Sequence, residues 1–73
     1  MEPTKRMELR EQLAALEHEQ WMAWATTIKK QELISKERAD RWMRLFAPYS
    51  ELSEADKEHD RKWADKVLEI IEG

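Results

Sequence analysis

The sequence predicts an all-α fold, in the form of a small three-helix domain with a long first helix. Apolar residues recur with a helical period in three separate segments. A serine suited to cap a helix precedes the second and the third of these segments. One glycine and two prolines among 73 residues are too few for a loop-rich or β-rich chain. A chain of this length predicts one domain, residues 1–73.

The first predicted helix runs from about Thr4 to near Lys30. Pro3 suits the first turn, where its missing N–H does no harm. The apolar residues recur close to a 3.6-residue period: Leu9, Leu13, Leu16, Trp21, Trp24 and Ile28. The β-branched run 26–28 weakens its end. This helix is about twice as long as the second, so we expect it to overhang its partners and to offer apolar surface to a second copy.

The second predicted helix begins after Ser35, whose hydroxyl can accept a hydrogen bond from a free N–H of the first turn. Its apolar face carries Ala39, Trp42, Met43 and Phe46, spaced i, i+3, i+4 and i+7. Pro48 stops it, because the residue before a proline is pushed out of the α region.

The third predicted helix follows Ser53, with Asp56 three residues later in a pattern similar to a capping box. Its apolar face carries Trp63, Val67, Ile70 and Ile71, with Ala64 and Leu68 beside it. Three amphipathic helices with short connections predict a helical bundle.

The small size limits the core that the chain can form. A domain of this length buries only about 60% of its unfolded surface, and with no cysteine it has no disulfide to supplement the core. Four tryptophans compensate for the small core, since each can bury ~150–250 Å² of surface. Oligomerisation is another source of stability for such a chain.

The sequence predicts a cytoplasmic protein without a membrane segment. No apolar run approaches the ~18 residues of a membrane span. The stretch "MEPTKRMELR" at the start is too charged for a signal peptide. The absence of cysteine fits the same compartment.

The net charge is −3, which makes a nucleic-acid regulator the least favoured of the functions considered. The charge is unevenly distributed, however. Residues 29–44 hold six bases and three acids, whereas both flanking segments are acidic. This middle segment is either a cationic face that attracts a small anion or a solvated helix face paired with its acidic neighbours.

The residues do not predict an enzyme or a cofactor. The stretch "HEQWM" has Met22 where a zinc protease helix of the H-E-x-x-H type has its second histidine, and methionine is a poor zinc ligand beside nitrogen and oxygen donors. A single glycine, at position 73, rules out a glycine-rich phosphate loop. No serine has a plausible base partner visible in the sequence.

Two aromatic positions have both a structural and a functional interpretation. His18 and Trp21 are neighbours on one helix face, either as a core histidine beside a core tryptophan or as the wall of a pocket. Trp42 lies on an apolar face, which favours a core role, so Arg41 at its edge is the better candidate for contact with a ligand. His59 and Asp60 offer a second polar spot.

Two stretches resemble the RyR domain, the repeat named after ryanodine receptor channels. The first is "LAALEHEQW", with a histidine three residues before a tryptophan. The second contains Pro48, Tyr49, Leu52, Lys57, Asp60 and Arg61. The positions that carry the resemblance are His18, Trp21, Pro48, Tyr49 and Leu52. The family usually has a G-W-x-Y-G segment after its first helix, where this chain has a predicted helical connection over 29–40.

The resemblance implies a binding or interaction module, similar to the short stand-alone members found in bacteria and phages. The leading hypothesis is a module that binds an anionic, nucleotide-like small molecule. Trp21 or Tyr49 would stack on a base, while His18 and Arg41 would offer polar contacts. The alternative is a structural or regulatory protein that acts through homo-oligomerisation or protein–protein contact, with the first helix as its interface.

Overall fold

The computed structural model describes residues 1–30 and 34–73. These residues form three α-helices and one short 3-10 helix: α1 (Pro3–Lys30), α2 (Lys36–Met43), η1 (Tyr49–Glu51) and α3 (Glu54–Glu72). The described ranges contain no strand. The prediction of an all-α, three-helix fold with a long first helix is therefore confirmed.

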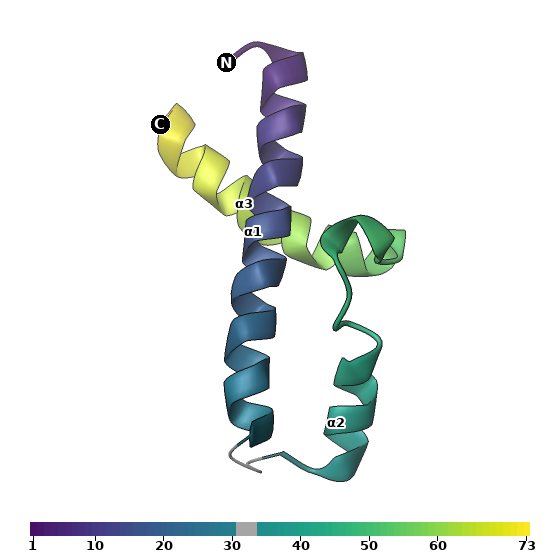
Figure 1. Cartoon of the computed structure of the whole chain (residues 1–73). Coiled ribbons are helices and arrows are strands. Elements are labelled where there is room, and N and C mark those ends of the chain that lie inside the picture. Colours follow the sequence, from purple (N-terminus) through teal and green to yellow (C-terminus); the bar gives the residue numbers. More distant parts are fainter. Residues whose placement is uncertain (31–33) are drawn as a thin grey trace.

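The helices are arranged around α1 as an axis (Figure 1). The α3 helix crosses the middle of α1, α2 lies beside the C-terminal half of α1, and the two chain termini lie at the same end of the molecule. The molecule measures 44 × 22 × 14 Å and its radius of gyration is 14.2 Å. A compact domain of this length would have a radius of gyration of about 11 Å, so the fold is elongated.

The bounds of α1 follow from local hydrogen bonds. The Glu2 carboxylate accepts from the backbone N–H groups of Thr4 and Lys5, at 2.8 and 3.2 Å, so this acid caps the N-terminus. Near the other end, the Thr26 hydroxyl donates to the carbonyl oxygen of Met22 at 2.7 Å. The β-branched run 26–28 nevertheless lies within the helix, and α1 ends at Lys30.

The start of α2 is confirmed and its predicted apolar face is wrong in part. The Ser35 hydroxyl accepts from the backbone N–H of Arg38 at 3.2 Å. The helix ends at Met43, so Phe46 lies beyond it, and the Met43 side chain is exposed. Of the predicted helical connection over 29–40, residues 31–33 lie outside the described residues, and Ser35 is not helical.

The N-cap of α3 is also confirmed, because the Ser53 hydroxyl accepts from the backbone N–H of Asp56 at 3.2 Å. The apolar face predicted for this helix is wrong in part, because Ala64 and Leu68, predicted beside it, are buried and its main residues are not. Trp63, Val67, Ile70 and Ile71 are 51%, 39%, 82% and 58% exposed. The side that faces α1 instead carries Asp60, Ala64 and Leu68, all buried. The ion pairs described below explain why this side of α3, and not the predicted apolar face, packs against α1.

The buried apolar core of the described residues is small: Ala14, Ala25, Leu52, Ala64 and Leu68. Alanine side chains on both helices allow the backbones of α1 and α3 to approach closely at their crossing. Leu68 is the largest side chain that is fully buried. No helix among the described residues is long and apolar enough to cross a membrane.

Candidate functional site

His18 connects three parts of the fold and is almost fully buried. It comes from α1, and its Nε2 lies 2.7 Å from the carbonyl oxygen of Ala47, in the segment after α2. Its Nδ1 lies 3.6 Å from Oδ2 of Asp60 on α3. A carbonyl oxygen only accepts hydrogen bonds, so Nε2 carries a hydrogen and donates it to Ala47.

Asp60, the group that faces Nδ1 of His18, is itself buried. Burial raises the pKa of the Asp60 carboxyl above its usual value, and electrostatic attraction to the neighbouring His18 ring opposes that increase. Each ring nitrogen of His18 thus faces an oxygen atom of the protein. The ring is held between the segment after α2 and the buried carboxyl of α3.

An aromatic cluster joins α1 to α2. Trp21 lies 5.4 Å from Trp42 and 5.5 Å from Phe46, measured between ring centroids. Trp24 also contacts Trp42, with 5.6 Å between ring centroids. The Arg38 guanidinium lies 4.9 Å from the Trp42 ring centroid. Edge-to-face and tilted pairs of this kind stabilise a packed core. The core interpretation of Trp21 and Trp42 fits these contacts, although neither side chain is fully buried.

Two hollows border this cluster. A groove of ≈ 580 Å³ is lined by Ala15, Glu19, Met22, Phe46, Ala47, Pro48, Tyr49 and Ser50. A smaller hollow of ≈ 180 Å³ is lined by His18, Trp21, Trp42, Leu45, Leu52, Asp56, His59 and Asp60. Only the groove is within the ~300–1,000 Å³ typical of pockets for drug-sized ligands.

The structure divides the predicted site residues between these places. Tyr49 lines the groove, whereas His18 and Trp21 line the smaller hollow. Arg41 is exposed on α2 and lines neither of them. Of the remaining positions that carry the family resemblance, Pro48 belongs to the groove and Leu52 to the smaller hollow.

The groove is mainly apolar, with charges of both signs nearby. Of the described residues that line it, Glu19 alone carries a charge. The Lys29 ammonium lies 5.7 Å from the Phe46 ring centroid, and the Lys57 ammonium lies 5.6 Å from that of Tyr49. The aromatic rings of the groove thus have cations beside them at distances typical of cation–π contacts.

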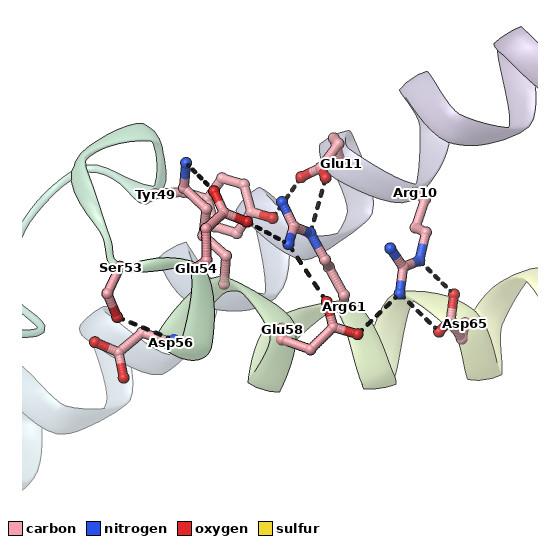
Figure 2. A network of polar contacts seen from close by, with 10 residues as sticks. Arg10, Glu11, Tyr49, Ser53, Glu54, Asp56, Glu58, Arg61 and Asp65 are labelled. Atoms are coloured by element: carbon pink, nitrogen blue, oxygen red, sulfur yellow. Dashed lines mark hydrogen bonds and ion pairs between the residues drawn. The ribbon is translucent and has the colours of Figure 1, made fainter.

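A polar network holds Tyr49 in place (Figure 2). Its hydroxyl donates to Glu11 of α1, and Arg61 of α3 donates from Nε to the same carboxylate at 2.8 Å. Burial and this hydrogen bond to Glu11 raise the pKa of Tyr49 to about 12. The phenol therefore stays protonated at neutral pH and is already paired within the protein.

The network continues along α3 through two arginines. Arg61 donates to Glu54 at 2.9 Å and to Glu58 at 3.3 Å. Arg10 of α1 holds Asp65 with two hydrogen bonds, at 2.7 and 3.1 Å, and also contacts Glu58 at 3.3 Å. A further ion pair joins Arg6 to Glu72 at 3.1 Å. These contacts turn the charged edge of α3 toward α1, which leaves its most apolar side outside.

Sequence reasoning did not identify Glu11, Arg10 or Asp65. Glu11 lies in a chain that is 40% charged, so nothing in its local pattern distinguishes it. Its partners are 38 and 50 residues away. The resemblance did include Arg61, which was the available signal for this network.

The outer side of α3 carries an exposed apolar stripe, defined here as Trp63, Val67 and Ile70. The described part of the chain covers the stripe only in part, since its three side chains are 51%, 39% and 82% exposed. The Lys66 ammonium lies 5.6 Å from the Trp63 ring centroid. Contiguous exposed apolar surface on a helix is typical of interaction sites.

In the described part of the chain, no group of three or more His, Asp or Glu side chains could hold a metal ion. Comparison of the chain with profiles of known protein families, with curated proteins and with solved structures gives no match.

Proposed function

We propose that the protein is a non-enzymatic interaction module that acts through protein–protein contact. The observation that carries this proposal is the apolar stripe of α3, Trp63, Val67 and Ile70, which stays exposed while small side chains form the core. Burying large apolar side chains is the main favourable term in protein association. A short chain that leaves such residues outside gains stability when a partner covers them.

The surface area supports the same proposal. The chain exposes 5638 Å², whereas a folded monomer of this mass is expected to expose about 4,800 Å². The excess, roughly 850 Å², follows from the elongated shape of the molecule. It leaves enough surface for a partner to bury the ~800 Å² per side of a standard protein interface.

The polar side chains support a non-enzymatic role. Both ring nitrogens of His18 face oxygen atoms of the protein, and the Tyr49 hydroxyl is paired with Glu11. The arginines that could bind an anionic substrate from α3 and α1, Arg61 and Arg10, are each neutralised by two or more carboxylates. These groups stabilise the crossing of α1 and α3.

Photo-cross-linking tests the proposal. A benzophenone side chain is placed at position 70 in the stripe, and the protein is irradiated both purified and inside the cells that produce it. We expect adducts with protein, either a second copy or another chain. The matched control places the same group at position 43, which is exposed on α2. Equal labelling from both positions, or none from position 70, would contradict an interaction role for the stripe.

A second candidate function is binding of an anionic, nucleotide-like small molecule in the groove. The observation that favours it is the position of Lys29 and Lys57 beside the Phe46 and Tyr49 rings, since a flat anion can use both rings and cations. The resemblance to the RyR domain supports the same class of ligand, in a bacterial or phage protein.

Tryptophan fluorescence during titration with adenine nucleotides tests this second candidate. Binding in the groove would change the emission of the neighbouring tryptophans, and Lys29→Ala should weaken it several-fold. Lys62→Ala is the matched control, because Lys62 is exposed and lines neither hollow. Unchanged fluorescence at saturating nucleotide, or equal losses in both variants, would remove the groove as a nucleotide site.

A further inference from the structure

The smaller hollow, of ≈ 180 Å³, combines a polar wall with an apolar one. The polar side chains come from α1 and α3: His18, Asp56, His59 and Asp60. The apolar side chains come from α1, from α2 and from the segments before and after η1: Trp21, Trp42, Leu45 and Leu52. None of these residues belongs to the α3 stripe or to the groove, so the hollow is a separate feature of the surface.

Asp60 is a buried carboxyl without a hydrogen-bond donor among the described residues. It is only 9% exposed, and the Nδ1 atom of His18 that faces it lies 3.6 Å from Oδ2, beyond hydrogen-bond distance. Fully enclosed polar atoms of the described side chains all have a hydrogen-bond partner, so the Asp60 oxygens are reached from the hollow that this residue lines. Burying an ionised carboxylate is unfavourable without a donor or an opposite charge. The raised pKa of this carboxyl, caused mainly by burial, agrees with that lack.

His18 offers a second acceptor beside Asp60. Its Nε2 donates to the carbonyl oxygen of Ala47, so in the neutral ring Nδ1 is the acceptor nitrogen. Since Nδ1 and Oδ2 of Asp60 are 3.6 Å apart, one donor group placed in the hollow can reach both. An ammonium group has three N–H donors and a positive charge that suits the carboxylate. No group of three or more His, Asp or Glu in the described chain could hold a metal ion, which favours a cation that binds through hydrogen bonds.

Two arginines beside the hollow demonstrate that its walls attract cations. The Arg38 guanidinium lies 4.9 Å from the Trp42 ring centroid, and Nη2 of Arg44 lies 3.6 Å from Oδ1 of Asp56. Tryptophan is the aromatic side chain that attracts cations most strongly. Both arginines are exposed and neither lines the hollow, so the interior beside Asp60 is left for a cation from outside.

We propose that the smaller hollow binds a small primary alkylammonium ion. The ammonium group donates to Asp60 and to Nδ1 of His18, and the alkyl chain packs on the apolar wall. The volume of ≈ 180 Å³ is below the ~300 Å³ at which pockets for drug-sized ligands begin, so the ligand has few carbon atoms. The same chemistry is supplied by a free amine or by a lysine side chain of another protein. The site does not involve the α3 stripe, so the inference goes beyond the proposed function and does not depend on it.

Titration with n-butylammonium chloride, followed by NMR of the indole N–H groups, tests the proposal. We expect saturable shifts of the Trp21 and Trp42 signals and none at Trp63, which lies outside the hollow. Sodium chloride at equal concentration is the control for ionic strength and should cause no saturable shift. The absence of saturable shifts with n-butylammonium would overturn the site.

Two further probes separate the charge from the hydrogen bonds. n-Butanol is similar in size but neutral, and n-butyltrimethylammonium is charged but has no N–H group. Each should bind roughly tenfold more weakly than n-butylammonium, or less tightly still. Equal binding of n-butanol would overturn the preference for a cation, and equal binding of the quaternary ion would overturn the hydrogen bonds. All three probes are compared on the wild-type protein, so the result does not depend on the stability of a variant.

Asp60→Asn tests the carboxylate, because it keeps the size of the side chain and removes its charge. We expect it to weaken binding of n-butylammonium by roughly tenfold or more, with far-UV circular dichroism as the check on folding. Glu69→Gln is the matched control, since Glu69 is an exposed carboxyl of α3 that lines neither hollow. Equal affinities of the wild-type protein and a folded Asp60→Asn variant would overturn the role of Asp60.

Nα-Acetyl-lysine methylamide distinguishes the two sources of the ligand, because it has the same butylammonium group attached to a peptide unit. Binding as tight as that of n-butylammonium supports a lysine of a partner protein. Binding of n-butylammonium alone supports a free amine. If neither probe binds, the proposal is overturned, while cross-linking from position 70 still decides the proposed function by itself.

Discussion

His18 of α1 donates a hydrogen bond from Nε2 to the carbonyl oxygen of Ala47, at 2.7 Å. This bond joins the longest helix to the segment that leads from α2 into η1. The same ring faces the buried carboxyl of Asp60 on α3 with its other nitrogen. One side chain thus fixes the relative position of three parts of the chain, and its loss removes a partner of the Ala47 carbonyl and of the buried Asp60 carboxyl.

Replacing His18 should therefore lower the free energy of unfolding by more than the size of its side chain suggests. We expect His18→Ala to lower the free energy of unfolding by ~2–4 kcal/mol, because Ala47 and Asp60 lose their partner inside the protein. Thermal unfolding followed by far-UV circular dichroism measures this. His59→Ala, at an exposed position, should change stability by less than ~0.5 kcal/mol. Equal effects of the two variants would show that the His18 contacts do not stabilise the fold.

Alkaline pH should destabilise the protein through Tyr49. Its pKa is raised to about 12 in the folded protein, against ~10 in an unfolded chain. The folded state then holds the phenolic proton more tightly, so stability is full below pH ~10 and falls as the pH rises toward 12. Tyr49 is the single tyrosine, so tyrosinate absorbance measures its titration directly.

A matched pair of variants checks the cause of this pH dependence. Tyr49→Phe should remove the extra loss of stability in that pH window. Glu11→Gln should lower the pKa of Tyr49 while keeping it above ~10, because burial is the larger cause of the shift. A titration midpoint near 10 in the wild-type protein would contradict the Tyr49–Glu11 pairing.

Acid should weaken the contact between α1 and α3. The hydrogen bond from Arg10 lowers the pKa of Asp65. Burial raises the pKa of Glu11, but the bonds from Tyr49 and Arg61 outweigh it, so the net shift is downward. Lowered carboxyl pKa values stabilise the fold above ~pH 4 and lose this effect as the pH falls. Urea unfolding should therefore show a lower midpoint in acid than at neutral pH.

Removing one arginine should reduce this acid sensitivity. We expect the decline between neutral and acidic pH to be smaller in Arg10→Met than in the wild-type protein, because Asp65 then keeps its usual pKa. Asp60 acts in the opposite direction, since burial raises its pKa and its ionisation disfavours the fold. A decline that is the same with and without Arg10 would contradict a role of the ion pair.

The core should depend strongly on Leu68. It is the largest fully buried side chain, and Leu68→Ala should cost about 3 kcal/mol, the usual magnitude for a buried leucine that leaves a cavity. In a chain of this length that is a large part of the total stability. Met7→Ala, at a position that is 69% exposed, is the control and should have little effect. A small effect of Leu68→Ala in equilibrium unfolding would contradict the packing of α3 on α1.

The aromatic residues show how far sequence reasoning reached into the candidate site. The spacing of His18 and Trp21 predicted their contact on α1, and their rings stack at 6.1 Å between centroids. Their separation from Tyr49 and Arg41 was not predictable. It depends on where the segment after α2 turns, and the bond from His18 to Ala47 contributes to that turn.

The sequence by itself determined where the helices lie and how they begin. Ser35 and Ser53 cap α2 and α3 as predicted, because capping and helical periodicity act between residues a few positions apart. Only the tertiary structure decided which side of α3 is buried. Apolar spacing favoured the stripe of Trp63, Val67 and Ile70, yet the arginines of α1 and the carboxylates of α3 pair across 48 to 66 residues of sequence and turn that stripe outward. Burial depends on partners distant in the chain, which local patterns do not specify.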